Sequence, residues 1–291
     1  MTRAVVYCYS QTGQLREVTD ALTAPLLERG WTIRTVNVQP RVAFPFPWPI
    51  RRFFGVFPAS VDPEALVELA DSPGGFETAP DEIVILAYQV WYLAPSLPVR
   101  SLIKEHPEAF RDRRVVSVIA CRNMWYSAAI EVAGLLRAAG ARSVEVVAAI
   151  DTRPQAVTFV TTLRWLLTGK REPFMRFGRA GVGDDELERV ERVGRQLAEG
   201  CCPSGAAPVV PTLAAADLLA GKLFRRWGAT VRSAGRFGGV AKAASLVVFV
   251  IGLGIGIAMG LPVIAGAAIL GGARFESRVR DYLYRRISFS P

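Results

Sequence analysis

The chain of 291 residues is long enough for one sizeable α/β domain and an appendage, and a second full domain is not required. Its residues are 51% hydrophobic and 21% charged with a mean hydropathy of +0.26, which excludes an ordinary soluble enzyme whose apolar surface all lies inside one core. Residues 1–200 hold 24 Lys and Arg against 23 Asp and Glu, whereas residues 201–291 hold 11 against 3, so the net charge of +9 belongs to the tail and no nucleic-acid partner is expected.

Short β-branched runs alternate with helical patterns in the first 200 residues. Strands are predicted at 4–9, 32–38, 82–88, 115–121 and 144–150. Helices are predicted at about 13–29, 62–71, 97–110, 126–139 and 183–199. This alternation predicts an α/β domain with a doubly wound, five-stranded parallel sheet in the order 2-1-3-4-5. No signal-peptide pattern precedes the first strand, which favours a cytoplasmic location for this domain.

The first loop after a strand has the composition of a phosphate site. It comprises Ser10, Gln11, Thr12, Gly13, Gln14 and Leu15. Hydroxyls, free backbone N–H groups and the positive end of a helix dipole suit one terminal phosphate, such as that of FMN. Gly13 allows the backbone to approach the ligand closely. The alternative is that Ser10 or Thr12 only caps the helix.

Two more loops leave strands at the same edge of the predicted sheet, where doubly wound folds bind ligands. We expect them to hold a flavin ring through Tyr88, Gln89, Val90 and Trp91 and through Arg122, Asn123 and Trp125. Each aromatic residue taken singly could instead be simple packing. The aromatic-rich inserts 40–60 and 152–182 are expected to form lids or binding surfaces, or else a plain cover for the sheet edge.

Several other kinds of site are excluded by missing residues. A P-loop pattern is absent from the sequence, and the single histidine, His106, leaves Ser–His, Cys–His and histidine-based metal sites without their central residue. The four cysteines show neither a disulfide framework nor zinc spacing. They are interpreted as structural residues, and no metal is expected.

Six segments together resemble a known family. They are YSQTGQL (9–15), TAPL (23–26), FPFPW (44–48), ILAYQVWYLAPSLP (85–98), ACRNMW (120–125) and TTLRWLLTGKREPF (161–174). Over about residues 4–199 the chain resembles the flavodoxin-like proteins known as dialkylresorcinol condensing enzymes, and more widely flavodoxins and FMN-dependent quinone reductases. The resemblance implies an FMN-binding domain over residues 1–200 and a ketosynthase partner. It also implies oxidation of an alkylated cyclohexane-1,3-dione to the aromatic resorcinol. Flavodoxins often have Thr where this chain has Leu15, which removes one hydroxyl donor.

The chemistry expected from this resemblance is transfer of a hydride from the substrate ring to the flavin and of a proton to a base or water. Arg122 is expected to stabilise the enolate of the dione, and Tyr88, Tyr92 and Tyr126 are candidate proton relays. One alternative is an NAD(P)H-dependent quinone reductase. Another is a protein without catalytic activity, either an electron carrier or a flavin-free partner of the ketosynthase.

The tail differs from the first domain in composition. Residues 201–212 are typical of a linker, residues 213–227 predict a basic amphipathic helix, and residues 243–273 form an uncharged run of 31 positions with basic flanks. The region 213–291 is therefore predicted to attach the protein to the cytoplasmic face of the cell membrane, where a hydrophobic substrate would partition. A re-entrant hairpin that turns near residues 260–262 and a single tilted span both remain open. The sequence is also compatible with a homodimer.

Overall fold

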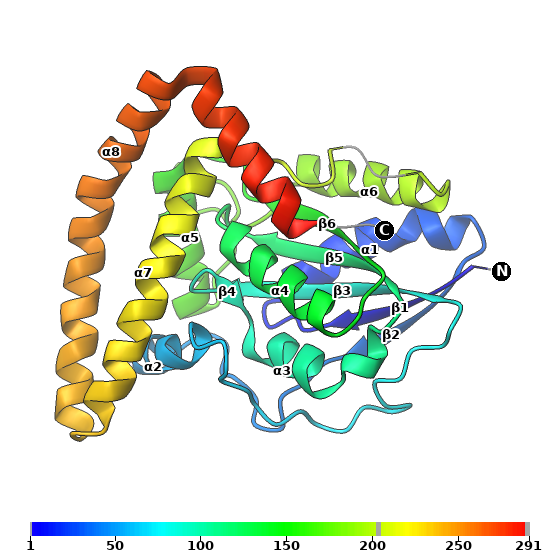
Figure 1. Cartoon of the computed structure of the whole chain (residues 1–291), viewed down its shortest axis with the longest axis horizontal. Coiled ribbons are helices and arrows are strands. Elements are labelled where there is room, and N and C mark those ends of the chain that lie inside the picture. The colour runs from blue at the N-terminus through cyan, green and yellow to red at the C-terminus, as the bar shows by residue number, and fades with distance from the viewer. Residues whose placement is uncertain (1, 202–204, 289–291) are drawn as a thin grey trace.

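The computed structural model describes residues 2–201 and 205–288, and its centre is a parallel sheet (Figure 1). The parallel strands are β1 (Arg3–Cys8), β2 (Thr32–Asn37), β3 (Glu82–Trp91), β5 (Arg114–Cys121) and β6 (Ser143–Ile150). They pair in the order β2-β1-β3-β5-β6, and the short strand β4 (Ala94–Pro95) pairs antiparallel with β3. Counted among the parallel strands alone, this order is 2-1-3-4-5. The predicted α/β class and the flavodoxin-like strand order are confirmed.

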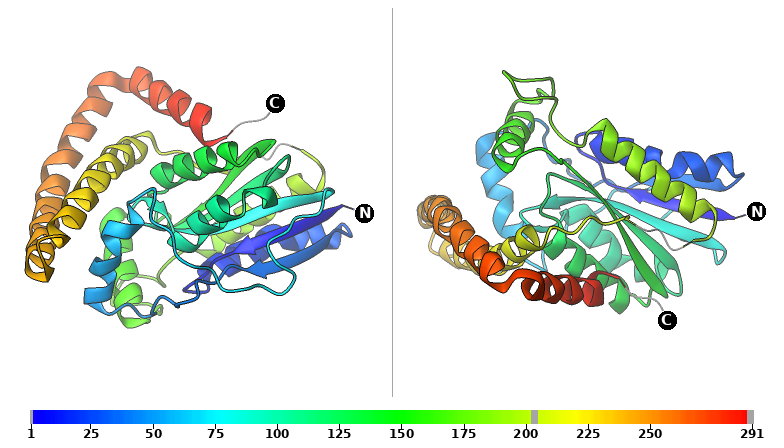
Figure 2. Two further views of the ribbon diagram at one scale, coloured as in Figure 1. Left: turned by 60° about the horizontal axis from the view of Figure 1, so that its bottom comes forward. Right: turned by 90° about the horizontal axis from the view of Figure 1, so that it is seen from above.

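Helices cover both faces of the sheet, as the two views of Figure 2 show. One face carries α1 (Gln14–Glu28) and α6 (Asp184–Ala198), and the other carries α3 (Leu97–Glu105), the short 3₁₀ helix η1 (Pro107–Ala109) and α4 (Tyr126–Ala138). Because both faces are buried, the central strands are almost continuously apolar, and that pattern is what made them predictable. The carboxyl ends of all five parallel strands meet at one edge.

The two inserts contribute helices at that edge. Helix α2 (Ile50–Ser60) lies within the first insert and α5 (Gln155–Thr168) lies within the second. The helix predicted over residues 62–71 is wrong, because Asp62 organises only a single turn there: its carboxylate accepts a hydrogen bond from the Glu64 N–H and its carbonyl accepts one from the Ala65 N–H. The chain then runs in extended form to a bridge between Pro40 and Leu69.

Strand β3 is longer than predicted. It continues to Trp91 and turns back into β4 through Tyr92 and Leu93, whose φ angles are 51° and 64°. Positive φ at both turn residues is the geometry of a tight β-hairpin, and it costs energy when neither residue is glycine. The predicted loop after the third strand is therefore a rigid hairpin.

The tail consists of α7 (Pro211–Gly235) and α8 (Gly239–Ile287), which run side by side along the carboxyl edge of the sheet (Figure 1). Helix α8 stays helical through residues 260–262 and breaks only at Gly272, with φ 46° and ψ −135°. The turn that the re-entrant hairpin requires at residues 260–262 is thus not formed. After Gly272 the chain returns to α4 and β6, where Leu283 and Ile287 are buried in the core.

Asp217 attaches the tail to the sheet domain. Its carboxylate accepts hydrogen bonds from the N–H groups of Tyr126 (3.1 Å) and Ser127 (2.8 Å) at the start of α4. A carboxylate from α7 therefore caps α4, where no side chain of its own does so. Burial raises the pKa of this carboxyl to about 6.

Candidate functional site

The predicted loops converge on one cavity at the carboxyl edge. It has a volume of about 210 Å³. It is lined from the first loop by Gln11, Thr12 and Gln14, from the hairpin by Gln89, Val90, Trp91 and Tyr92, and by Cys121 at the end of β5 and Arg122 directly after it. Both inserts also line it, with Trp48, Phe53, Val56, Thr162, Trp165, Leu166 and Gly181. The inserts are therefore part of the cavity wall, as the lid interpretation predicts.

The amino end of α1 is open to an anion. Its N-cap is Gly13 in the left-handed conformation (φ 84°), and no side chain caps the helix. The alternative interpretation, in which Ser10 or Thr12 caps this helix, therefore does not apply. A Cβ on Gly13 would meet no atom within 4 Å. The first N–H groups of this helix remain available to a ligand.

Two side-chain atoms beside this helix end are buried without a partner. The Ser10 Oγ and Gln14 Nε2 atoms have no hydrogen-bond partner among the residues that the structure describes. Gln14 fits there because Gly181, with φ 96°, passes over it: a Cβ at Gly181 would lie 2.0 Å from Gln14 Nε2. Buried polar atoms are nearly always satisfied in folded proteins, so unsatisfied donors that share one loop indicate a missing acceptor such as a phosphate.

Unsatisfied polar atoms gather in all three loops. Five of the eight such buried side-chain atoms within the described ranges belong to them: Ser10 Oγ, Gln14 Nε2, Gln89 Oε1, Asn123 Oδ1 and Trp125 Nε1. The set holds donors as well as acceptors. Of these five residues, Gln14 and Gln89 line the cavity, so a polar ligand there could accept from Gln14 Nε2 and donate to Gln89 Oε1.

Part of the first insert lies across the cavity. The Gln11 side chain donates from Nε2 to the Pro45 carbonyl (2.8 Å) and accepts from Trp48 Nε1 at Oε1 (3.0 Å). Trp48 in turn packs edge-on against Trp91, with 5.6 Å between ring centroids. The cavity is smaller than the roughly 300–1,000 Å³ of most ligand pockets. A larger ligand therefore requires Gln11 and Trp48 to move aside.

Arg122 places a positive charge at this cavity. Its guanidinium lies 5.6 Å from the centre of the Phe159 ring and donates from Nη1 to the Gln155 carbonyl at 3.4 Å. Desolvation lowers the pKa of Arg122, and no carboxylate pairs with it among residues 2–201 and 205–288. The nearby Asp151 carboxylate interacts with this charge but forms its ion pair with Arg153, so the partly buried Arg122 favours a ligand that is anionic or develops negative charge.

The predicted tyrosines do not lie together. The Tyr88 side chain is fully buried in the sheet core, with its hydroxyl near Ser117 Oγ (3.4 Å), and it does not line the cavity. The Tyr126 hydroxyl accepts from the Val210 N–H at the start of the tail (3.0 Å). Only Tyr92 reaches the cavity, and its hydroxyl donates to the Phe53 carbonyl (2.7 Å). Proton relay by Tyr88 or Tyr126 thus has no geometric support.

Three other predicted binding residues contribute less than expected. Trp125 is fully buried and stacks on Tyr126 at 4.4 Å, so its ring is not at the cavity. Asn123 is also buried, and its Nδ2 donates to Gln155 Oε1 at 2.8 Å. The Leu15 side chain packs in the core under α1, which leaves only its backbone N–H facing the loop.

Cys121 lines the cavity but does not have the environment of a nucleophile. Burial raises the pKa of its thiol well above the usual range, so the thiol stays protonated at neutral pH. This agrees with the interpretation of the cysteines as structural residues. Cys202 lies outside the described residues.

Several lining residues had no specific signal in the sequence. Val56, Thr162 and Gly181 belong to the inserts, whose aromatic content indicated a binding surface but not which side chains face inward. Gly181 could have been recognised only through its contact with Gln14, which is distant in the chain. Alternation and spacing give no information on such contacts.

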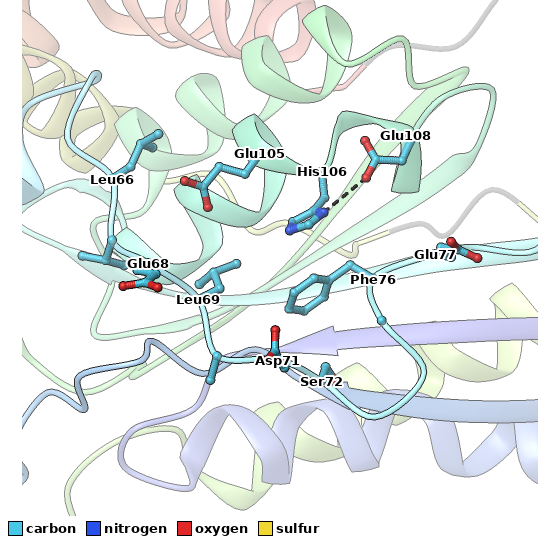
Figure 3. A pocket seen from close by; sticks show the side chains of 13 residues that line it. Leu66, Glu68, Leu69, Asp71, Ser72, Phe76, Glu77, Glu105, His106 and Glu108 are labelled. Carbon is cyan, nitrogen blue, oxygen red and sulfur yellow. Dashed lines mark hydrogen bonds and ion pairs between the residues drawn. The ribbon is translucent and has the colours of Figure 1, made fainter.

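A larger cavity lies elsewhere and has the opposite charge. It measures about 630 Å³ and is lined by Glu68, Asp71, Glu77, Glu105 and Glu108 (Figure 3). His106 sits among them, with Nδ1 3.2 Å from Glu108 Oε1. Such a wall repels phosphate, so cavity size does not identify the anion site. In the part of the chain that the structure describes, no group of three or more His, Cys, Asp or Glu residues could hold a metal ion.

Comparisons with known proteins return only distant structural likeness. No protein-family model matches the chain, and no curated protein matches it in sequence. Among solved structures, the chain is similar to a flavodoxin from the domain Archaea, with 14% identity, 69% of this chain and 98% of that chain covered, and a TM-score of 0.38. It is also similar to the NAD(P)H:quinone oxidoreductase from Methanothermobacter marburgensis, with 11% identity, 67% and 94% covered, and a TM-score of 0.33. The fold assignment therefore depends on the strand order itself.

Proposed function

We propose that this protein is an FMN-dependent oxidoreductase. The observation that carries the proposal is the loop at the amino end of α1, which combines an uncapped helix, the left-handed Gly13 and the unsatisfied Ser10 Oγ and Gln14 Nε2 atoms. These groups fit the single terminal phosphate of FMN. The carboxyl edge of a sheet with this strand order is also where such folds bind their ligands.

The rest of the cavity suits the ring of the flavin. Trp91 and Trp165 supply flat apolar surface, and the unpaired Gln89 Oε1 supplies an acceptor for a ring N–H. When bound, FMN supplies two-electron oxidation or reduction of an organic substrate. The protein supplies binding, orientation and the exclusion of water by the two inserts.

We further propose that the substrate is an alkylated cyclohexane-1,3-dione, which becomes a dialkylresorcinol by loss of two hydrogens. In this proposal Arg122 stabilises the enolate oxygen of the dione; its presence at the cavity and the pairing of the nearby Asp151 with Arg153 support this role. Tyr92 is the remaining tyrosine at the cavity, and with its hydroxyl bonded to Phe53 it orients the α2 lid. The proton that leaves the substrate then passes to water.

Anaerobic mixing tests this function. The protein is loaded with FMN, freed of oxygen and mixed either with an alkyl cyclohexane-1,3-dione or with NADPH, while the flavin absorbance is followed. We expect the dione to bleach the flavin and to yield the resorcinol. Bleaching by NADPH alone would favour a quinone reductase instead, and a protein that stays colourless with added FMN would favour a flavin-free partner of a ketosynthase.

The Arg122→Ala variant tests the role of the guanidinium. We expect the rate of flavin bleaching by the dione to fall by about a hundredfold, on the scale of losing one oxyanion-stabilising group, while FMN still binds. The matched control is Arg142→Ala, which removes an exposed arginine directly before β6, at the edge of the sheet opposite to the cavity. Full turnover in Arg122→Ala would remove the assignment.

A further inference from the structure

Among the residues that the structure describes, α8 exposes many large apolar side chains. These side chains are between 40% and 91% exposed and are Val240, Val247, Val248, Val250, Ile251, Ile255, Val263, Ile269 and Leu270. Within the described residues, α8 is the one helix long and apolar enough to cross a membrane: its window Gly239–Gly256 has a mean hydropathy of 2.0 and is 6% buried. Monomeric soluble proteins seldom expose apolar patches of this extent.

One side of α8 packs on the domain. Phe249 is 1% exposed and stacks on Phe57 of α2, with 4.1 Å between the ring centroids. Phe224 and Trp227 of α7 belong to the same cluster. The helix is therefore apolar on both sides, but only one side has a partner within the structure, as the outer position of α8 in Figure 2 shows.

We propose that the α7–α8 tail binds the surface of an anionic lipid membrane, with α8 lying in the plane of the interface and its exposed side in the acyl region. Basic residues stand at both ends of the apolar run: Arg236, Lys242, Arg274 and Arg278. Phe237, 85% exposed, joins them at the turn between the helices. An apolar strip with cationic ends matches a membrane surface that combines acyl chains with negative headgroups.

The anchoring of both ends argues for in-plane binding. The start of the tail is held by Asp217 on α4, and its last segment by the buried Leu283 and Ile287. If α8 alone crossed a bilayer, these two anchors would lie on opposite sides of it, which their packing on one domain forbids. Helix α7 is not suited to cross beside α8, because it carries Lys222, Arg225, Arg226 and Arg232. The 31 uncharged residues also extend about 46 Å as a helix, longer than a hydrocarbon core of roughly 30 Å.

The charge pattern also argues against a second copy of this chain as the occupant. Two copies paired through α8 would bring the cationic ends of one helix against those of the other, because residues 201–291 hold 11 Lys and Arg against 3 Asp and Glu. Like charges at a shared interface are unfavourable. Nucleic acid would accept the charges but would leave the apolar strip exposed to water.

This surface lies one helix away from the candidate site. Phe57 of α2 touches Phe249 of the tail, while its neighbour Val56 lines the cavity. If the proposed function holds, a lipid-dissolved substrate would meet the α2 lid at the membrane. The membrane proposal itself does not depend on the flavin.

Cosedimentation of the full chain with vesicles tests the proposal. The vesicles are either pure phosphatidylcholine or an equal mixture of phosphatidylcholine and phosphatidylglycerol, at low and high salt. We expect binding to the mixed vesicles that weakens with salt. Ile251→Glu, at a side chain 60% exposed, should weaken this binding at least about tenfold without changing the thermal melting curve.

The matched control is Val42→Glu, which makes the same charge change at an 82% exposed position outside the tail and should bind vesicles like the unmodified protein. Equal loss of binding in both variants would overturn the proposal, as would no sedimentation with either vesicle. A dimer in lipid-free solution that Ile251→Glu dissociates would also overturn it and would assign the surface to self-association.

Discussion

In residues 2–201 helices cover both faces of the sheet, whereas in the α7–α8 tail one side of α8 is covered and the other is exposed. The two regions also differ in charge, with the first near neutral and the second strongly basic. The domain is closed on itself, and its polar loops meet at one edge. The tail packs on the domain and leaves apolar side chains of α8 exposed.

The seam between α1 and α6 should be the most sensitive part of the closed domain. A Cβ on Gly194 would lie 2.2 Å from the Leu22 carbonyl oxygen, which is backbone and cannot easily move. We expect Gly194→Ala to lower the free energy of unfolding by about 3 kcal/mol in urea denaturation. Gly134→Ala, in α4 with no atom within 4 Å of the new Cβ, is the control and should be neutral or stabilising by about 0.5–1 kcal/mol.

The attachment of the tail should depend on pH through Asp217. Because the pKa of this carboxyl is raised to about 6, the folded state binds its proton more tightly than the unfolded state does. Its contribution to stability is therefore complete below about pH 4 and is lost as the pH rises through about 6. Relative to Asp217→Asn, the unmodified protein should lose on the order of 2–3 kcal/mol between pH 4 and pH 7. Parallel pH profiles in denaturant titrations would contradict this.

The packing of α7 on α2 should be sensitive to a single added methyl group. A Cβ on Gly228 would lie 2.2 Å from Val61 Cγ2. We therefore expect Gly228→Ala to lower the free energy needed to detach the tail from the domain by about 1–2 kcal/mol. Hydrogen exchange should become faster in α7 and α8 and remain unchanged in the sheet. Uniform acceleration over the whole chain would mean that the two regions unfold as one unit.

The affinity for FMN should depend on the position of the Gln14 side chain. Gly181→Ala would place its Cβ on Gln14 Nε2 and would strain a backbone with φ 96°, so FMN affinity should fall about tenfold. Gly200→Ala strains a similar φ of 76° with no atom within 4 Å and should bind FMN normally. Fluorescence quenching of FMN measures both. Equal affinities for the two variants would exclude Gln14 from the phosphate site.

The parallel sheet and the meeting of its loops could be predicted, because apolar strands alternated with helices and parallel strands share one carboxyl edge. The role of Tyr88 could not, since β3 continues past it to Trp91 and alternation turns its side chain into the core. The role of Tyr126 could not be predicted either, because its hydroxyl accepts a hydrogen bond from the N–H of Val210, which is distant in the chain. Helix α2 escaped prediction because Gly55 and Pro58 lower its helix propensity, and tertiary packing of Phe57 overrides this.

In the proposed function, the amino end of α1 binds the phosphate of FMN. Titration of the flavin-free protein with FMN and with riboflavin, followed by flavin fluorescence, tests this directly because the two ligands differ only in the phosphate. We expect FMN to bind about a hundredfold more tightly than riboflavin. Equal affinities, or no binding of either, would contradict the account.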